Sequence, residues 1–429
     1  MTTRRNVLRT FAGSPLILGA APGDRLNIAA VGVGGMGANY IDGCRSENIV
    51  ALVDVDDAYA AKTYAKYPKA KTYRDVRVML DQEKSVDAVI IGTPDHSHSA
   101  IALAAMQTKK HLYCAKPLTN TIGEARRVVE TARAAQIATQ MSVQSCGSDA
   151  SLNTVEWVRS GVIGPVSEVH VWSDRPVWPQ AVARPNDTPV VPKGLDWKAW
   201  LGRAPERPYH PLYHPFNWRG WYDFGTGALG DMGCHTLHVI VQALELGLPS
   251  SVQASAGVMM EPALAGNADT KWTRSKKAVT PETYPSASIV TWEFRERNAR
   301  VIWYDGGLKP ARPSGLPRDQ VMGADGILFR GSLGVILSKF TGTPYLVPSK
   351  ANAGWQPPAK TLPRSTGHYA EWIAAAKGGK PAMCNFDFAG QLTEIALLGA
   401  LAQRTGKYLE WDAEHMMVSN EPIYNRLLL

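Results

Sequence analysis

Cysteine is scarce in this sequence of 429 residues. The five cysteines, Cys44, Cys114, Cys146, Cys234 and Cys384, are odd in number, lie far apart and include no CxxC pair. A disulfide framework and a zinc site are both disfavoured, because each needs paired or regularly spaced cysteines. We therefore expect no metal site, and we expect Cys114 and Cys234 to be small buried side chains rather than nucleophiles.

Long basic blocks, internal repeats and low-complexity tracts are also absent. The formal net charge is +8, and Arg4, Arg5 and Arg9 fall in an N-terminal segment that we expect to be removed, which leaves +5. Positive charge spread in this way is typical of a solvated surface, so we expect no nucleic-acid partner. With 45% hydrophobic residues, a chain of this length can bury the cores of two domains.

The N-terminal segment, residues 1–23, contains a twin-arginine pattern at residues 3–8 (TRRNVL), followed by an interrupted apolar stretch. That stretch is too short to span a membrane, and residues 18–20 (LGA) offer small side chains for cleavage. The pattern resembles a Tat export signal, which predicts a periplasmic or exported protein that engages the Tat machinery. The alternative is a basic N-terminus without an address, on a cytoplasmic protein.

Between residues 26 and 141, short apolar runs alternate with helical stretches, a pattern typical of βαβ units in a parallel sheet. Strands are expected at residues 26–31, 49–53, 88–91, 111–114 and 137–141, and helices at residues 57–67, 99–107 and 122–135. We therefore predict an α/β Rossmann domain over residues 24–145.

The pattern changes after residue 150. The expected elements are helices at residues 152–160, 368–376 and 389–404, and strands at residues 166–172, 286–295, 300–304 and 335–340. Strands that follow one another with Gly/Pro loops between them favour a mostly antiparallel sheet. We predict an α+β domain over residues 146–429 that binds the substrate and forms a homo-oligomer, with helices at its C-terminal end.

A glycine-rich run follows directly after the first expected strand, at residues 32–37 (GVGGMG). Its first glycine permits a tight turn, its second lets the backbone approach a pyrophosphate, and its last allows close packing of the following helix. Asp54 lies 17 residues after the last glycine, where its carboxylate would accept from ribose hydroxyls and repel a 2′-phosphate. We therefore predict NAD rather than NADP, held by Gly32, Gly34, Gly35, Met36, Gly37 and Asp54.

Three further motifs follow in order: residues 93–98 (TPDHSH), 114–118 (CAKPL) and 230–235 (GDMGCH). Together with the glycine run, they resemble the Gfo/Idh/MocA oxidoreductases over nearly the whole chain after the N-terminal segment. Residues 171–180 and 385–390 resemble the exported branch of that family, which includes the family 109 glycoside hydrolases. The resemblance implies a Rossmann domain followed by an α+β domain.

The resemblance also implies that Lys116, Asp231 and His235 form the catalytic set. Oxidation of a secondary alcohol needs a base of near-neutral pKa at the hydroxyl group, and His235 fits this role. Asp231, four residues earlier, projects from the same helix face, and Lys116 would stabilise negative charge on the oxygen from the opposite side. The family's usual pattern is Glu-Lys-Pro, whereas Ala115 precedes Lys116 here, so a carboxylate near the nicotinamide ribose is missing.

Further contacts are expected at strand ends and in the aromatic-rich segment before residue 221. Predicted cofactor contacts are Thr93, Pro94, His96, His98, Lys116 and Gln144. A metal pair at His96 and His98 is disfavoured because no third ligand is evident. Predicted substrate contacts, from flat aromatic faces and hydrogen-bonding groups, are Arg175, Trp178, Tyr213, His214, Trp218 and Arg219. The alternative for most of the tryptophans is packing in a core or at an interface.

These residues leave three functions open. The first is an NAD-dependent oxidoreductase that acts on a secondary hydroxyl of a sugar, cyclitol or glycoside. The second is a redox-neutral glycosidase or lyase that uses tightly bound NAD for transient ring oxidation. Export favours this second function because free NAD is scarce outside the cytoplasm, and the same argument allows hydride transfer between two sugars. The third is an inactive cofactor- and saccharide-binding protein, supported by Ala115 but opposed by the intact catalytic set.

Overall fold

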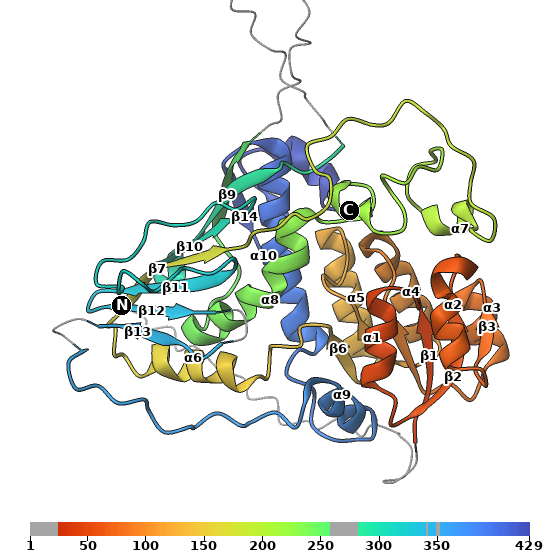
Figure 1. Ribbon diagram of the computed structural model, residues 1–429, viewed down its shortest axis with the longest axis horizontal. Helices are drawn as coiled ribbons and strands as arrows, with labels where there is room; N and C mark the ends of the chain where they lie inside the picture. The colour runs from red at the N-terminus through yellow and green to blue at the C-terminus, as the bar shows by residue number, and fades with distance from the viewer. Residues whose placement is uncertain (1–24, 258–281, 340–341, 349–351) are drawn as a thin grey trace, which may run out of the picture.

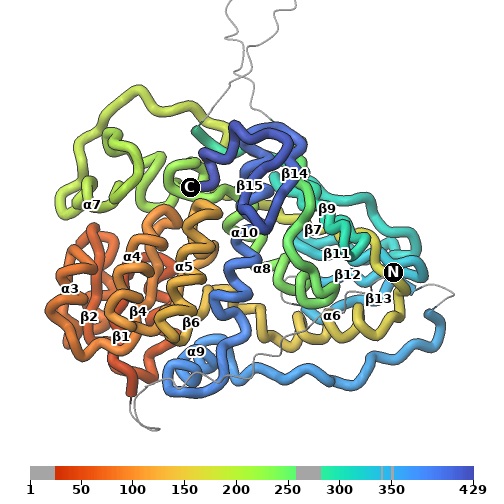
Figure 2. The backbone as a smooth tube through the Cα atoms, turned by 180° about the vertical axis from the view of Figure 1, so that it is seen from behind, coloured from red at the N-terminus to blue at the C-terminus, as the bar shows by residue number. Residues whose placement is uncertain are grey.

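The computed structural model describes residues 25–257, 282–339, 342–348 and 352–429. The segment interpreted above as an export signal, residues 1–23, lies outside this range. Two domains lie side by side, and long helices run between them (Figures 1 and 2). No helix in the described residues is long and apolar enough to cross a membrane.

The first domain is a six-stranded parallel sheet with the strand order β3-β2-β1-β4-β5-β6. The strands are β1 (Asn27–Val31), β2 (Asn48–Val53), β3 (Lys71–Tyr73), β4 (Ala88–Ile91), β5 (His111–Cys114) and β6 (Thr139–Met141). The helices are α1 (Met36–Gly43), α2 (Asp57–Lys66), α3 (Val76–Gln82), α4 (Asp95–Gln107) and α5 (Ile122–Ala135). β4 and β5 are buried along their whole length, as in a sheet covered on both faces. The predicted Rossmann fold is confirmed.

The order of the strands reverses between β1 and β4, so the ligand crevice of such a sheet lies at their carboxyl ends. β3 was not expected from the sequence. It is only three residues long, and its side chains are mostly polar and not buried. The sequence therefore contains no apolar run that would indicate a strand there. Its register with β2 nevertheless places the residues that follow it beside the end of β2.

The second domain contains a nine-stranded, mostly antiparallel sheet with the order β13-β12-β11-β7-β10-β9-β8-β14-β15, in which β7 and β10 pair in parallel. Its strands are β7 (Val166–Trp172), β8 (Ser251–Gly257), β9 (Ala287–Phe294), β10 (Ala299–Tyr304), β11 (Gly326–Gly331), β12 (Val335–Ser338), β13 (Tyr345–Val347), β14 (Leu409–Asp412) and β15 (Met417–Val418). The predicted mostly antiparallel sheet is confirmed, although β8, β11 and β13–β15 were not expected, because they are short or rich in small or polar residues.

Helices of the second half of the chain connect the two domains. They are α6 (Asp149–Arg159), α8 (Gly227–Leu244), α9 (His368–Ala376) and α10 (Phe386–Thr405). α10 packs against α5 of the first domain and against α8 and β8 of the second. α9 contributes Trp372, which is fully buried, to the core around Tyr113 of the first domain. These contacts fix the position of α8 relative to the Rossmann strands.

A long connection between β7 and α8, which we call the strap (residues 173–226), leaves the second domain and passes over the first, next to α2 and α4 (Figure 1). It contains the short helix α7 (Trp197–Leu201) and the 3-10 helix η1 (Asn217–Gly220). An aromatic cluster that includes Trp200, Tyr213, Trp221 and Phe224 gives the strap its own core. The strap therefore forms a packed cover and carries all six predicted substrate contacts.

Candidate active site

A groove of about 990 Å³ runs along the carboxyl ends of the Rossmann strands, beneath the strap. Its lining combines both domains and includes Gly32, Gly34, Met36, Asp54, Thr93, Pro94, Lys116, Gln144, Arg175, Trp178, His214, Trp218, Arg219, Asp231 and His235. We call the part beside Asp54 the β2 end and the part beside Asp231 the α8 end. The groove thus joins the predicted cofactor residues to the predicted catalytic residues.

The glycine run forms the floor of the β2 end. Gly32 has a φ of +74°, and a Cβ atom there would lie 2.6 Å from the backbone nitrogen of Thr93. A Cβ atom on Gly37 would lie 1.8 Å from the carbonyl oxygen of Gly32, so α1 can pack this closely only with glycine. Gly35 precedes α1 without a side-chain cap in the described chain, and the first N–H groups of the helix are suited to a phosphate. These features fit a dinucleotide.

Asp54 holds the glycine turn. Its Oδ2 accepts a hydrogen bond from the Val33 nitrogen at 2.8 Å, and its Oδ1 accepts one from the Asp56 nitrogen at 3.0 Å. Burial raises the pKa of Asp54 above its ordinary value, although these backbone donors oppose the shift. The Gly34 N–H group acts on the carboxylate in the same direction, and the two oxygens together still have acceptor capacity for a further donor. Asp54 therefore combines a structural role with the predicted contact to a ribose.

Two arginines at the β2 end were not found from the sequence. Arg74 and Arg77 follow β3 and line the groove because β3 pairs with β2. Each is already paired with a carboxylate, Arg74 with Asp57 and Arg77 with Asp75. The two arginines lie about twenty residues beyond Asp54 in the sequence, outside the glycine-run motif, so no local pattern identifies them.

The strap closes over the β2 end through hydrogen bonds of the backbone. The Asp196 nitrogen donates to the Val55 oxygen at 2.8 Å, and the Asp57 nitrogen donates to the Gly194 oxygen at 3.2 Å. His214 Nε2 lies 2.7 Å from Asp56 Oδ2, and both side chains are nearly buried. His214, predicted as a substrate contact, therefore lies at the β2 end, where it attaches the strap to the first domain.

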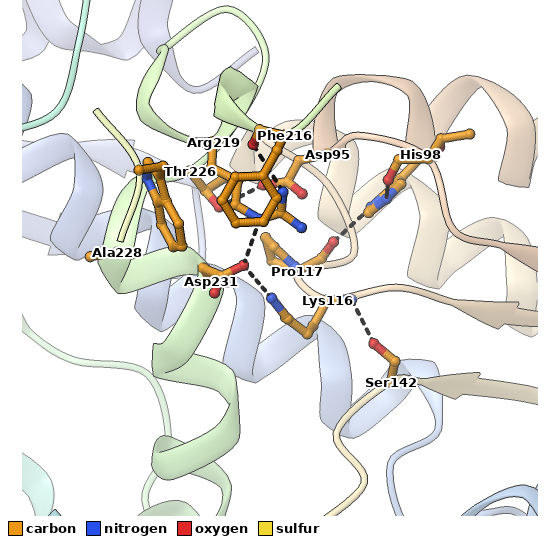
Figure 3. A network of polar contacts seen from close by, with 12 residues as sticks. Asp95, His98, Lys116, Pro117, Ser142, Phe216, Arg219, Thr226, Ala228 and Asp231 are labelled. Atoms are coloured by element: carbon orange, nitrogen blue, oxygen red, sulfur yellow. Dashed lines mark hydrogen bonds and ion pairs between the residues drawn. The ribbon is translucent and has the colours of Figure 1, made fainter. Parts of the chain in front are cut away.

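The α8 end brings charged groups of the two domains together. Lys116 follows β5, and its Nζ lies 2.5 Å from Oδ1 of Asp231 on α8; Figure 3 shows the two side chains pointing toward one another. The Arg219 Nε lies 3.3 Å from the same oxygen. Burial opposes ionisation of Asp231, but the two cations outweigh it and lower the pKa to about 2. Asp231 is therefore a carboxylate at any physiological pH.

His235 lies one helical turn after Asp231 and lines the same end of the groove. Burial, with a contribution from the charge of Lys116, lowers the pKa of His235 to about 3, although Asp231 opposes the shift. The imidazole is therefore neutral at physiological pH, but it is a weaker base than the near-neutral one expected from the sequence. The structure thus brings together the three predicted catalytic residues, Lys116, Asp231 and His235.

Aromatic rings surround the guanidinium of Arg219. Its carbon Cζ lies 4.3 Å from the ring centre of Trp218, 4.5 Å from that of Phe216 and 5.7 Å from that of Trp178. Nη1 also donates to the carbonyl oxygen of Phe216 at 3.0 Å (Figure 3). Trp178 and Trp218 were predicted to contact the substrate directly, and they also hold Arg219. Phe216 was missed, since one phenylalanine in a loop gives no signal.

Comparison with known proteins agrees with this geometry. Residues 26–143 match the family model described as "Oxidoreductase family, NAD-binding Rossmann fold", and residues 165–268 match "Oxidoreductase family, C-terminal alpha/beta domain". The chain belongs to the Gfo/Idh/MocA family. Its first domain is accordingly the NAD-binding domain of this family.

Curated relatives match the first domain. Inositol 2-dehydrogenase 1 of Saccharopolyspora erythraea is 31% identical over 108 residues, which are 24% of this chain and 32% of the relative. D-xylose 1-dehydrogenase (NADP(+)) of Hypocrea jecorina is 31% identical over 115 residues, which are 27% of each chain. The matched region thus spans about a third or less of these relatives.

Solved structures share the whole fold. The WlbA dehydrogenase from Chromobacterium violaceum, in complex with NADH and UDP-GlcNAcA, has a TM-score of 0.62 at 16% identity, over 93% of this chain and 99% of that one. The aldose-aldose oxidoreductase of Caulobacter crescentus has a TM-score of 0.55 at 16% identity, over 90% of this chain and 100% of that one. At this identity, the likeness establishes the fold.

Asp95 adds a carboxylate to the α8 end, where the charges of Lys116 and Asp231 act on its pKa. Asp95 stands at the start of α4, is 5% exposed and accepts a hydrogen bond from Thr226 Oγ1 at 2.7 Å. Burial raises its pKa to about 7, although the charge of Lys116 opposes the shift. Asp95 belongs to the motif at residues 93–98 but was not among the predicted contacts.

Two predicted contacts, His98 and Tyr213, need correction, and a third, His96, has an added role. His98 does not line the groove, because it is fully buried and its ring nitrogens lie 2.9 Å from the Pro117 oxygen and 2.8 Å from the Thr93 oxygen. His96 lines the groove, but its Nε2 lies 3.0 Å from the oxygen of Trp200 and holds the strap. Tyr213 is 2% exposed and packs inside the strap. In the described residues, no cluster of three His, Cys, Asp or Glu side chains is placed to hold a metal.

Proposed function

We propose that this protein is an NAD-dependent oxidoreductase that oxidises a secondary hydroxyl group of a sugar, cyclitol or glycoside. The observation that carries the proposal is the Lys116–Asp231 contact of 2.5 Å, with His235 one turn away, at the end of a dinucleotide groove. Membership of the Gfo/Idh/MocA family supports it. The relatives named as dehydrogenases of inositol and of D-xylose support this class of substrate.

Each side chain of the α8 end has a separate role in the proposed reaction. Bound NAD⁺ supplies the acceptor for the hydride that leaves the carbinol carbon. His235, which is neutral, takes the hydroxyl proton, so that the alcohol loses one hydride and one proton and becomes a carbonyl group. Lys116 donates to the oxygen on which negative charge develops, and Asp231 holds the lysine ammonium in place.

A redox-neutral reaction of a glycoside is a second candidate. It is favoured by the attachment of the strap over the β2 end, since an enclosed cofactor stays bound between turnovers. The resemblance of residues 171–180 and 385–390 to family 109 glycoside hydrolases points the same way. In this scheme, transient oxidation of the ring acidifies the neighbouring C–H bond, the glycosidic group is eliminated, and the hydride returns to the sugar.

We also propose that the protein is exported by the Tat route and that it forms a homo-oligomer. The twin arginines at residues 3–8 support the first proposal. Fractionation of cells that express the full chain tests export, and light scattering of the purified protein tests the oligomeric state. The third function, an inactive binding protein, is disfavoured because Lys116, Asp231 and His235 all line the groove, with Lys116 in contact with Asp231.

Two measurements test the proposed function. The purified protein is denatured and analysed by mass spectrometry for released NAD or NADP. It is then incubated with free sugars, cyclitols, sugar acids and aryl glycosides, with and without added NAD⁺, while NADH and cleaved aglycone are followed. We expect NADH to form in stoichiometric amounts with at least one polyol. Cleavage of a glycoside without added NAD⁺ would support the second candidate instead, and no turnover with any compound would support the binding protein.

A further inference from the structure

The α8 end carries more positive than negative charge. The cations Lys116 and Arg219 share a single acceptor, Oδ1 of Asp231, at 2.5 Å and 3.3 Å. His235 adds no charge because burial lowers its pKa to about 3. Asp95 adds less than one negative charge at neutral pH, because burial raises its pKa to about 7. A partly buried cation without a full partner attracts an anionic ligand, since Coulomb interactions are strong where water is excluded.

Arg219 differs from an arginine with a purely structural ion pair. Arg126 of the same chain contacts both oxygens of Glu394, with Nε at 2.9 Å and Nη2 at 2.6 Å. Arg219 reaches its carboxylate with Nε alone, at 3.3 Å, although Lys116 already holds that carboxylate more closely. In the described residues, Nη2 of Arg219 makes no hydrogen bond. The ion pair with Asp231 therefore uses only the Nε–H group of Arg219 and leaves N–H groups of Nη1 and Nη2 for another acceptor.

The guanidinium is nevertheless held in place. The rings of Trp178, Phe216 and Trp218 lie around it, and the Phe216 carbonyl fixes Nη1. A guanidinium group held in this way loses little conformational freedom when it binds a ligand. Its two parallel N–H groups match the spacing of the two oxygens of a carboxylate. The remaining N–H groups of Nη1 and Nη2 form such an edge. Arg175 also lines the groove, but it is already paired with Asp174 at 2.5 Å, so it is not a free cation.

We propose that the substrate is a sugar acid, such as a uronate or an aldonate, and that Arg219 binds its carboxylate. The proposal rests on the proposed function and names its substrate class. Because Arg219 and Lys116 contact the same oxygen of Asp231, their cationic groups lie within the span of one sugar ring. A carboxylate on Arg219 thus places a ring hydroxyl at Lys116 and His235. The reaction is the same as above: hydride to NAD⁺, proton to His235, and a keto acid as product.

The experiment compares acids with neutral compounds of the same shape. D-glucuronate, D-galacturonate and D-gluconate are tested against D-glucose, D-galactose and the methyl ester of D-glucuronate. Binding is measured by calorimetry with NADH present, and oxidation is measured with NAD⁺. We expect at least one acid to bind and react about 10- to 100-fold better than its neutral counterpart, as for a charged hydrogen-bonded pair. In Arg219→Met this ratio falls toward one, whereas Arg219→Lys keeps part of it.

The control is Arg300→Met, which removes an exposed arginine of β10 that pairs with Glu293, away from the groove. It keeps the wild-type ratio. If no acid binds better than its neutral counterpart, or if Arg219→Met leaves the ratio unchanged, the inference is wrong, while NADH formation from a neutral polyol still supports the proposed function. If acids bind through Arg219 but are not oxidised, the inference stands and the proposed oxidation fails.

Discussion

The two ends of the groove are built from different kinds of contact. At the β2 end, the strap is attached mainly by backbone hydrogen bonds between residues 55–57 and 194–196, with one histidine–carboxylate pair added. At the α8 end, two cationic side chains, Lys116 from the first domain and Arg219 from the strap, meet at one oxygen of Asp231. The first arrangement suits the retention of a ligand, and the second suits chemistry.

This difference predicts how each end responds to substitution. Backbone hydrogen bonds survive most changes of side chain, so loss of one group at the β2 end weakens a cover that still has other attachments. The contacts of the α8 end are made only by side chains, so a substitution removes a contact entirely and changes the charge around the remaining groups. We therefore expect the effects of single substitutions to be much larger at the α8 end.

The largest effect is expected for Lys116→Met. Without the Lys116 ammonium, no hydrogen-bond donor stabilises the negative charge that develops on the substrate oxygen during the reaction. We therefore expect kcat/KM for the best substrate to fall roughly 10²- to 10³-fold. Steady-state rates of NADH formation measure the loss. The matched control is Lys84→Met, which removes an exposed lysine paired with Asp81 and keeps wild-type rates. A loss of less than 10-fold in Lys116→Met would exclude the assigned role.

A smaller effect is expected at the β2 end for His214→Phe. This change removes the contact with Asp56, so the strap opens more often and the affinity for NAD falls about 10-fold. Equilibrium titration with NADH, followed by its fluorescence, measures the dissociation constant. His210→Phe is the control, because His210 lies on the same strap but pairs with the exposed carboxylate of Asp187. Equal affinities of the two variants would contradict the role of the strap.

The sequence predicts the α8 end better than the β2 end, for a physical reason. Lys116 at a strand end and Asp231 on a helix belong to local motifs, so the three proposed catalytic residues could be named and are found together at one end of the groove. β4 and β5 have the predicted bounds because they are continuous apolar runs. The contact of His214 with Asp56 joins residues that are 158 positions apart, and no local pattern carries that information.

Residues next to a motif were harder to assign than the motif itself. His98 and Tyr213 were placed at the site by their positions, but a position near a strand end or in an aromatic loop does not show where a side chain points. His98 turns toward two backbone oxygens and Tyr213 toward the core of the strap. Asp95, which does line the groove, was not among the predicted contacts, because its partner Thr226 is remote in sequence.

The smallest effect, a pH trend, concerns Asp95 and the charge of the α8 end. In the folded chain, burial raises the pKa of Asp95 from 3.8 to about 7. Between pH 4 and pH 7 the unfolded chain loses this proton while the folded chain keeps it, so the contribution of Asp95 to the free energy of unfolding falls as the pH rises. Outside that window the contribution is constant. Asp95→Asn removes the trend, so the Tm of the variant relative to wild type rises from pH 4 to pH 7 and then levels.

Thermal unfolding of both proteins at several pH values between 4.5 and 8.5 measures this difference. Asp42→Asn is the control, because its hydrogen bond with Lys66 lowers the pKa of Asp42, so its stabilisation is complete above pH 4 and is lost only as the pH falls further. A constant Tm difference between wild type and Asp95→Asn would show that Asp95 ionises in the folded chain as it does in the unfolded one. The α8 end would then hold a second full negative charge, balance its two cations without a ligand, and lose its preference for an acidic substrate.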